Sequence, residues 1–152
     1  PTHRRQPANP ATMKAAERAP LGRRLGSLLY EMLVILALGI FLFILPVALF
    51  AGLTQRIPGT GLLWLYLFML LGSYFVWCWS RAGQTLAMKT WRLRLVDAQS
   101  GLPLRPLQAL VRYGMGWICW PTGLALLWSL IDPDRQFLHD RIAGSRIVQL
   151  PK

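Results

Sequence analysis

Two long blocks without a charged side chain decide what this chain can become. Residues 32–55 and 57–80 form two blocks of 24 residues each, and only Arg56 separates them. At about 1.5 Å per residue, a helix of either length can cross a hydrocarbon layer of roughly 30 Å. The sequence therefore predicts a helical membrane protein, in which each polar group within the membrane needs a partner.

A third apolar stretch, about residues 107–131, gives a weaker signal than the first two. Its uncharged part covers residues 113–131 and is interrupted by Gly114, Gly116, Pro121 and Gly123. If straight, it would barely span the hydrocarbon; if bent at Pro121, it would form a re-entrant or interfacial hairpin. Both alternatives stay open here, and we favour the bent form because it keeps the basic C-terminal tail inside.

The distribution of basic residues predicts which side of the membrane each loop faces. Of the 17 Lys and Arg residues, six precede residue 27, one is Arg56, six lie between 81 and 112, and four follow residue 131. Basic loops stay on the cytoplasmic side. We therefore expect a disordered, basic, cytoplasmic N-terminal tail over residues 1–21 and an outward-facing turn over residues 54–61. The net charge of +11 then reflects topology and attraction to anionic lipids, and we expect no nucleic-acid binding.

Two segments outside the spans show a β pattern. Residues 91–97 alternate between apolar and polar side chains, and residues 146–150 favour a strand. A lone strand leaves its backbone groups unpaired, so we expect the two to pair on one side of the membrane. The fold class predicted is an all-α membrane protein with a small cytoplasmic β element. Residues 22–152 would form its membrane domain, with spans at about 28–53 and 61–80, the Pro-broken third segment at about 107–131, and a cytoplasmic tail at 132–152.

Three motifs in order resemble a known family. They are GRRLGSLLYE at residues 22–31, GQTLAMKTWRLRLVD at 83–97, and DPDRQFLHDRIAGSR at 132–146. Together with the apolar blocks, they make residues 21–150 similar to the RDD family of bacterial inner-membrane proteins, named for an arginine and two aspartates. The resemblance implies an integral protein of the inner membrane whose molecular activity is largely undefined.

The resemblance also implies a set of polar residues to examine. Arg24 matches the family arginine, and Glu31 stands where many members carry aspartate early in the first span. The second aspartate is Asp132 or Asp140, and we prefer Asp140 because it lies in the Leu-His-Asp motif. The candidate cluster, functional or structural, is Arg24, Glu31, Asp132, His139 and Asp140.

Glu31 is the most informative of these residues, because a carboxylate within an apolar helix is costly. It lies only about one turn, roughly 5 Å, inside its block, where a side chain can still reach water. Arg24 and Ser27 precede it by seven and four residues and share its helical face. One interpretation is an interfacial charge pair that sets helix depth, and the other is a cation or proton site.

The candidate residues near the C-terminus, Asp132, His139 and Asp140, can be explained by contacts that stabilise the fold. Asp132 suits a helix N-cap, with Pro133 at the first helical position. We expect His139, Asp140 and their neighbours to tie the tail to Lys89, Arg92 or Arg94.

Catalytic, cofactor and metal sites find little support in the sequence. His139 has no second nitrogen ligand or candidate nucleophile nearby, and Cys78 and Cys119 stand alone in apolar blocks. We therefore expect a non-enzymatic protein without cofactors. The leading hypothesis is an accessory or scaffolding subunit that docks on other membrane proteins, and self-association is an alternative. The runner-up is a cation- or proton-coupled transporter formed by several copies, using Glu31 with Asp132 or Asp140.

Overall fold

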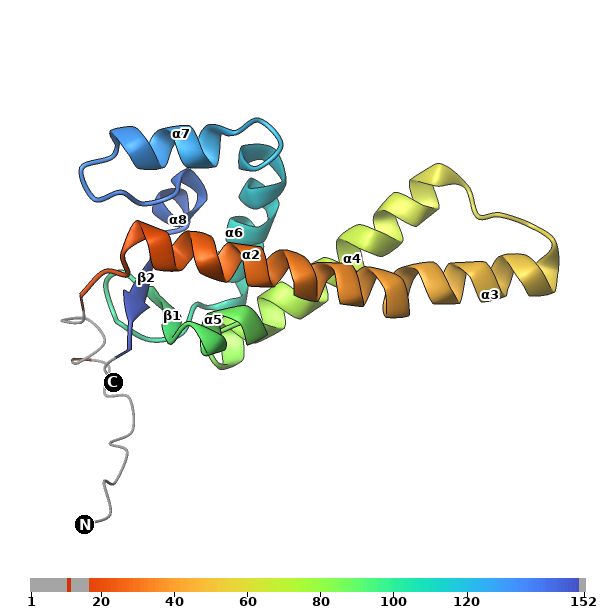
Figure 1. The fold of residues 1–152 in the computed structure, drawn as a ribbon, viewed down its shortest axis with the longest axis horizontal. Coiled ribbons are helices and arrows are strands. Elements are labelled where there is room, and N and C mark those ends of the chain that lie inside the picture. Colours follow the sequence, from red (N-terminus) through yellow and green to blue (C-terminus); the bar gives the residue numbers. More distant parts are fainter. Residues whose placement is uncertain (1–10, 12–16, 151–152) are drawn as a thin grey trace, which may run out of the picture.

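The computed structural model describes residue 11 and residues 17–150, so most of the predicted N-terminal tail lies outside the described residues. The main elements are two long apolar helices, a bent pair of shorter helices and a two-stranded sheet (Figure 1). The predicted fold class is confirmed. The sheet and the short helices gather at one end of the two long helices, and the connection between the long helices lies at the other end.

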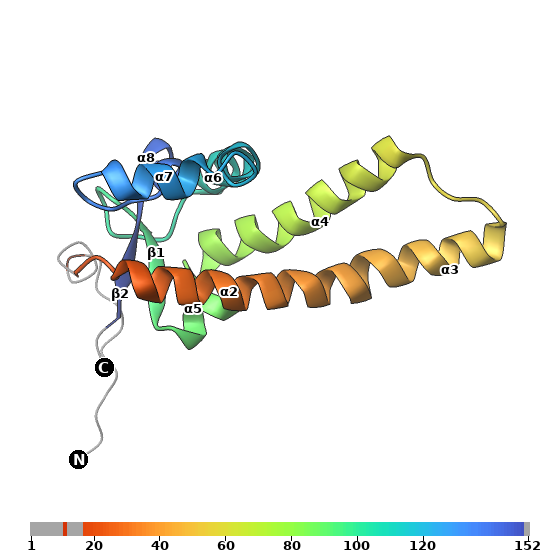
Figure 2. The same ribbon diagram turned by 45° about the horizontal axis from the view of Figure 1, so that its top comes forward.

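The first long helix runs without interruption through three segments. They are α2 (Leu21–Leu38), the π-helical segment η1 (Gly39–Ile44) and α3 (Leu45–Thr54), together 34 residues. At about 1.5 Å per residue the helix is about 51 Å long, which exceeds a hydrocarbon layer of about 30 Å. Its ends therefore reach the polar surfaces of the bilayer. The second span, α4 (Thr60–Arg81), returns beside it, and its start diverges from α3 (Figure 2).

Pro46 explains the π-helical segment. Proline has no N–H group and cannot bond to the carbonyl four residues earlier, which belongs to Leu42. The helix widens instead, so that the Leu45 N–H bonds to the carbonyl of Ile40. The Tyr66 hydroxyl on α4 donates to the Leu42 carbonyl, which satisfies the orphaned acceptor. This hydrogen bond joins the two spans in the middle of the apolar region.

The third apolar stretch is a bent pair. Helix α6 (Pro106–Cys119) and helix α7 (Leu124–Ile131) meet at an angle of 100°. Gly123 takes a left-handed conformation (φ +71°) at the bend, just after Pro121. Strands on either side of this pair hydrogen-bond to one another, so both of its ends lie on the same side of the bilayer. The pair therefore returns to the side from which it starts.

The sheet joins segments far apart in the sequence. Strand β1 (Leu93–Asp97) pairs antiparallel with β2 (Ser145–Gln149), with Leu95 opposite Ile147. On the other edge of β2, the Ala19 N–H bonds to Ile147 O (3.1 Å) and the Gln149 N–H bonds to Glu17 O (3.1 Å). The expectation of a disordered tail up to residue 21 is therefore wrong for its last residues, because β2 offers them an edge to pair with.

The core lies at the sheet end of the molecule. Leu93 and Leu95 of β1 pack with Trp79 of α4 and with Ala109 and Tyr113 of α6, and all five are buried. Close packing of α4 on α6 depends on Gly72, because a Cβ there would stand 3.0 Å from the Tyr113 ring. Two short helices complete this end of the fold, namely α5 (Leu86–Thr90) and α8 (Leu138–Ile142).

Candidate functional site

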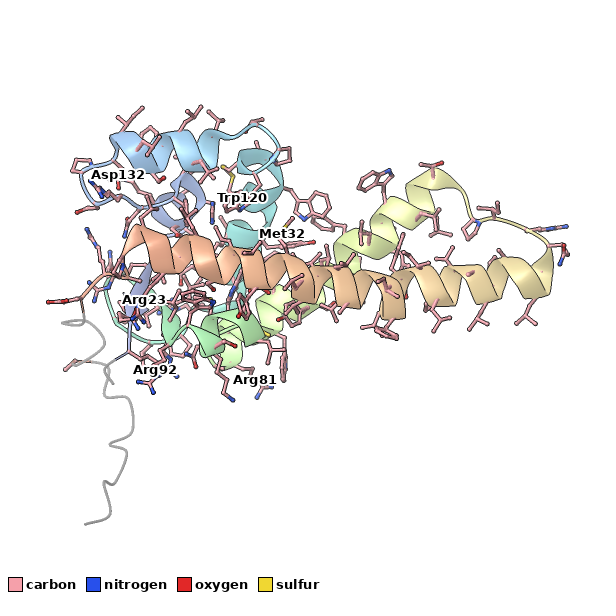
Figure 3. The ribbon with its side chains drawn as sticks, in the orientation of Figure 1. Arg23, Met32, Arg81, Arg92, Trp120 and Asp132 are labelled. Atoms are coloured by element: carbon pink, nitrogen blue, oxygen red, sulfur yellow. The ribbon has the colours of Figure 1, made fainter. Side chains whose placement is uncertain are left out.

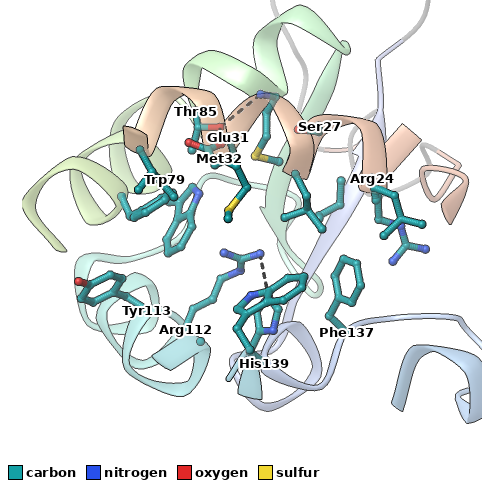
Figure 4. A pocket seen from close by; sticks show the side chains of 18 of the residues that line it. Arg24, Ser27, Glu31, Met32, Trp79, Thr85, Arg112, Tyr113, Phe137 and His139 are labelled. Carbon is teal, nitrogen blue, oxygen red and sulfur yellow. Dashed lines mark hydrogen bonds between the residues drawn. The ribbon is translucent and has the colours of Figure 1, made fainter. Parts of the chain in front are cut away.

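A cavity of about 790 Å³ lies between the start of the first span and the elements at the sheet end. Its walls are mostly apolar, and its polar groups come from α2, from the loop before α5, and from α6 and α8 (Figure 4). The polar lining residues are Arg24, Ser27, Glu31, Thr85, Arg112 and His139.

The polar face of α2 points into the protein. Arg24, Ser27 and Glu31 are its three buried residues, as spacings of three and four residues along a helix require. Glu31 is buried, and it accepts a hydrogen bond from the Thr85 hydroxyl. Thr85 also caps α5 by accepting from the Met88 N–H (3.2 Å). Glu31 thus ties the first span to the loop that follows the second, and it forms no ion pair with Arg24.

Arg112 is the centre of the site, and sequence reasoning missed it. Its Nε and one terminal nitrogen both contact Asp140 Oδ1, at 2.7 and 2.6 Å, and both side chains are buried. The guanidinium also stacks 4.2 Å from the Trp79 ring centre. We expected Lys89, Arg92 or Arg94 as partners of Asp140. Arg112 is the partner of Asp140 instead, because α6 packs against α8. In the sequence, Arg112 stands at the edge of an apolar block, and this position suggested only the boundary of a span.

His139 is held neutral beside this ion pair. Burial lowers its pKa to about 4, and the nearby Arg112 charge acts in the same direction, while Asp140 opposes both. Its Nε2 lies 3.5 Å from Arg112, and its ring stacks on Phe137 with the planes 5° apart. The neutral ring thus serves as a wall of the cavity.

Asp132 lies outside the cavity and is not the N-cap that we expected. It follows the last residue of α7, and α8 begins only at Leu138. Its Oδ2 accepts from the Gln136 N–H (3.0 Å) and its Oδ1 pairs with Arg141, so it closes the turn between the two helices. The structure therefore brings Arg24, Glu31, His139 and Asp140 together and places Asp132 beside them in a separate contact.

Buried charge is concentrated around the cavity. The four buried charges at the site are two guanidiniums and two carboxylates, of which only Arg112 and Asp140 pair directly. Across residue 11 and residues 17–150, no group of His, Cys, Asp or Glu side chains is arranged to hold a metal ion. Two carboxylate oxygens, Glu31 Oε1 and Asp140 Oδ2, are buried without a hydrogen-bond partner.

Comparisons with known proteins point in one direction. A sequence model described as the RDD family matches residues 18–144. An uncharacterized protein of Rickettsia prowazekii (strain Madrid E) is 32% identical over 81 residues, which are 53% of this chain and 45% of that protein. The chain thus covers less than half of the relative's length. No solved structure matches the chain.

Proposed function

The chain belongs to the RDD family, and we propose that it is a non-enzymatic accessory subunit that docks on other proteins of the bacterial inner membrane. Docking would occur through the outer half of the helix hairpin, and the cavity and sheet would stand at the inner surface.

The observation that carries this proposal is the uncovered outer half of the first span. No residue of η1 or α3 is buried, so α4 does not cover the side chains of α3. The two helices diverge toward their connection (Figure 2). Helices in lipid associate by packing and by interhelical hydrogen bonds. Between two diverging helices, a helix of another protein can pack against α3 and against the start of α4 at the same time.

The basic loops support the proposed orientation. Arg23 and Arg92 lie at the sheet end (Figure 3), whereas Arg56 is the one basic residue of the connection between α3 and α4. The positive-inside tendency places the sheet end in the cytoplasm. Single cysteines at Ser100 and Arg141, in a chain whose own two cysteines are replaced by serine, should both resist an impermeant thiol reagent in intact cells. Labelling of either one from outside contradicts this orientation.

Docking is tested by photo-crosslinking in membranes. A photoreactive amino acid at Leu53, an exposed residue of α3, should yield one defined crosslinked heterocomplex, identified by mass spectrometry and by native mass after mild extraction. The same group at Leu86, exposed at the opposite end, is the matched control and should not yield that product. Crosslinks from Leu53 only to lipid, or only to a second copy, would refute the accessory role.

The alternative is transport of a cation or proton by an oligomer, and one observation favours it. Two buried carboxylates, Glu31 and Asp140, each keep one oxygen without a partner. Against it, the buried charges gather at one end of the hairpin, and η1 and α3 contribute no charged residue toward the other end. Ion flux into liposomes that is lost in Glu31→Gln at unchanged protein yield would establish transport.

A further inference from the structure

The cavity has an apolar lateral wall that opens from the fold. Leu29 and Met32 of α2 and Leu126 of α7 line the cavity. The first two are about two-thirds exposed, and Leu126 is 41% exposed. Residues that line a cavity and are also exposed mark its opening. Because these residues belong to apolar helices, the opening faces lipid rather than water.

One buried charge in the wall has no carboxylate in contact with it. Arg24 is only 5% exposed, and none of the ion pairs formed by residues 17–150 includes it. Its Nε donates to the Ala19 carbonyl (2.9 Å), and its guanidinium lies 5.6 Å from the Phe137 ring centre. Arg112, by contrast, is neutralised by Asp140. Asp140 attracts the Arg24 charge only from a distance, because it is in direct contact with Arg112. An anion in contact with Arg24 would therefore stabilise its buried guanidinium.

The position of Arg24 along the span fits a lipid headgroup. It lies 30 residues before Thr54, which is about 45 Å along the helix and close to the full thickness of a bilayer with its headgroups. The wall from Leu25 to Ile35 then lies at the depth of the acyl chains of the same leaflet. Glu31 lies seven residues, or about 10 Å, deeper than Arg24 and is bonded by Thr85, so it does not contact the headgroup.

We propose that this cavity binds one anionic phospholipid, with its phosphate against Arg24 and an acyl chain along the α2 wall through the opening beside α7. The volume of about 790 Å³ lies within the range of pockets that enclose small amphiphilic ligands. Figure 4 places Arg24 and Phe137 at one side of this space and Met32 at its middle. The site is independent of the protein that the hairpin contacts.

Native mass spectrometry of the full chain in neutral detergent tests the proposal. With phosphatidylglycerol and phosphatidylcholine of equal chain length, we expect the first to be retained about ten-fold more strongly, which corresponds to about 1.4 kcal/mol. Arg24→Gln should abolish the preference, and Arg24→Lys should keep it. Arg23→Gln removes the same charge from the neighbouring exposed position and should leave the preference unchanged.

Two competitor ligands distinguish binding of the whole lipid from binding of its headgroup alone. Dihexanoyl phosphatidylglycerol and inorganic phosphate should each compete at least about ten-fold more weakly than the long-chain lipid, because neither fills the apolar wall. Equal competition by inorganic phosphate would indicate an anion site only and would overturn the proposal. So would equal retention of the two lipids by the unmodified chain, a result that needs no variant to fold.

Discussion

Breaking the ion pair between Arg112 and Asp140 is the sharpest test of the site. Asp140→Asn keeps the size of the side chain but leaves the Arg112 guanidinium buried without a counter-ion. The two side chains are 8% and 1% exposed, and their contacts are 2.6 and 2.7 Å. Removing one partner of such a buried pair costs about 3–5 kcal/mol. At about 2–4 °C per kcal/mol for a chain of this size, the melting temperature should fall by about 6–20 °C.

The two free cysteines of the chain provide the assay. Cys78 and Cys119 are both buried, so a thiol-reactive dye reports unfolding in detergent as the temperature rises. The matched control is Asp134→Asn, which breaks the exposed ion pair with Arg18. An exposed pair contributes about 0–1 kcal/mol, so the control should lose no more than about 4 °C.

A double variant identifies the cause of the loss. Replacing both Arg112 and Asp140 by leucine removes both buried charges, so it should recover much of the stability that Asp140→Asn loses. If Asp140→Asn melts like Asp134→Asn, or if the double variant is no more stable than the single one, the pair does not hold α6 and α8 together as we have reasoned.

Three further outcomes are expected in the same assay. Gly83→Ala should lower the melting temperature, because Gly83 has φ +66° and a Cβ there would stand 2.6 Å from the Leu95 carbonyl oxygen, whereas Gly22→Ala, with open space around it, should not. Tyr66→Phe should cost about 1 kcal/mol by orphaning the Leu42 carbonyl, and Tyr30→Phe, an aromatic neighbour of Trp91, should cost less. The folded protein lowers the pKa of His139 from 6.5 to about 4, so it binds this proton less readily than the unfolded chain does. Stability should therefore be lost as the pH falls from 6.5 toward 4, and His139→Gln should flatten this dependence; equal slopes in both proteins would contradict the burial of a neutral ring.

Hydropathy and strand periodicity predicted the elements of this fold for simple reasons. A charge-free block of 24 residues, such as 32–55, has only one low-energy environment, so its place in a membrane follows from composition. The alternation around Leu93 and Leu95 predicted a strand because one face of that strand is buried.

The contacts within the site could not be predicted in the same way. Asp140 pairs with Arg112, 28 residues away, because two helices pack, and no local pattern encodes that choice. The pairing of Glu17 and Ala19 with β2 likewise depends on an edge formed at the other end of the chain. Helical spacing did predict that Arg24 and Glu31 share a face, but the partner of Glu31, Thr85, comes from a loop that follows another span.

The pairing of β2 on both of its edges has a consequence for biogenesis. Strand β2, which is synthesised after both spans, holds both the segment that leads into the first span and the strand that follows the second. Both spans can enter the bilayer during translation, yet their ends beside the sheet gain these neighbours only when β2 has been synthesised. A chain that stops before residue 145 would thus be inserted without the hydrogen bonds of β2. Both of its spans would be free to tilt, and quality-control proteases would recognise it.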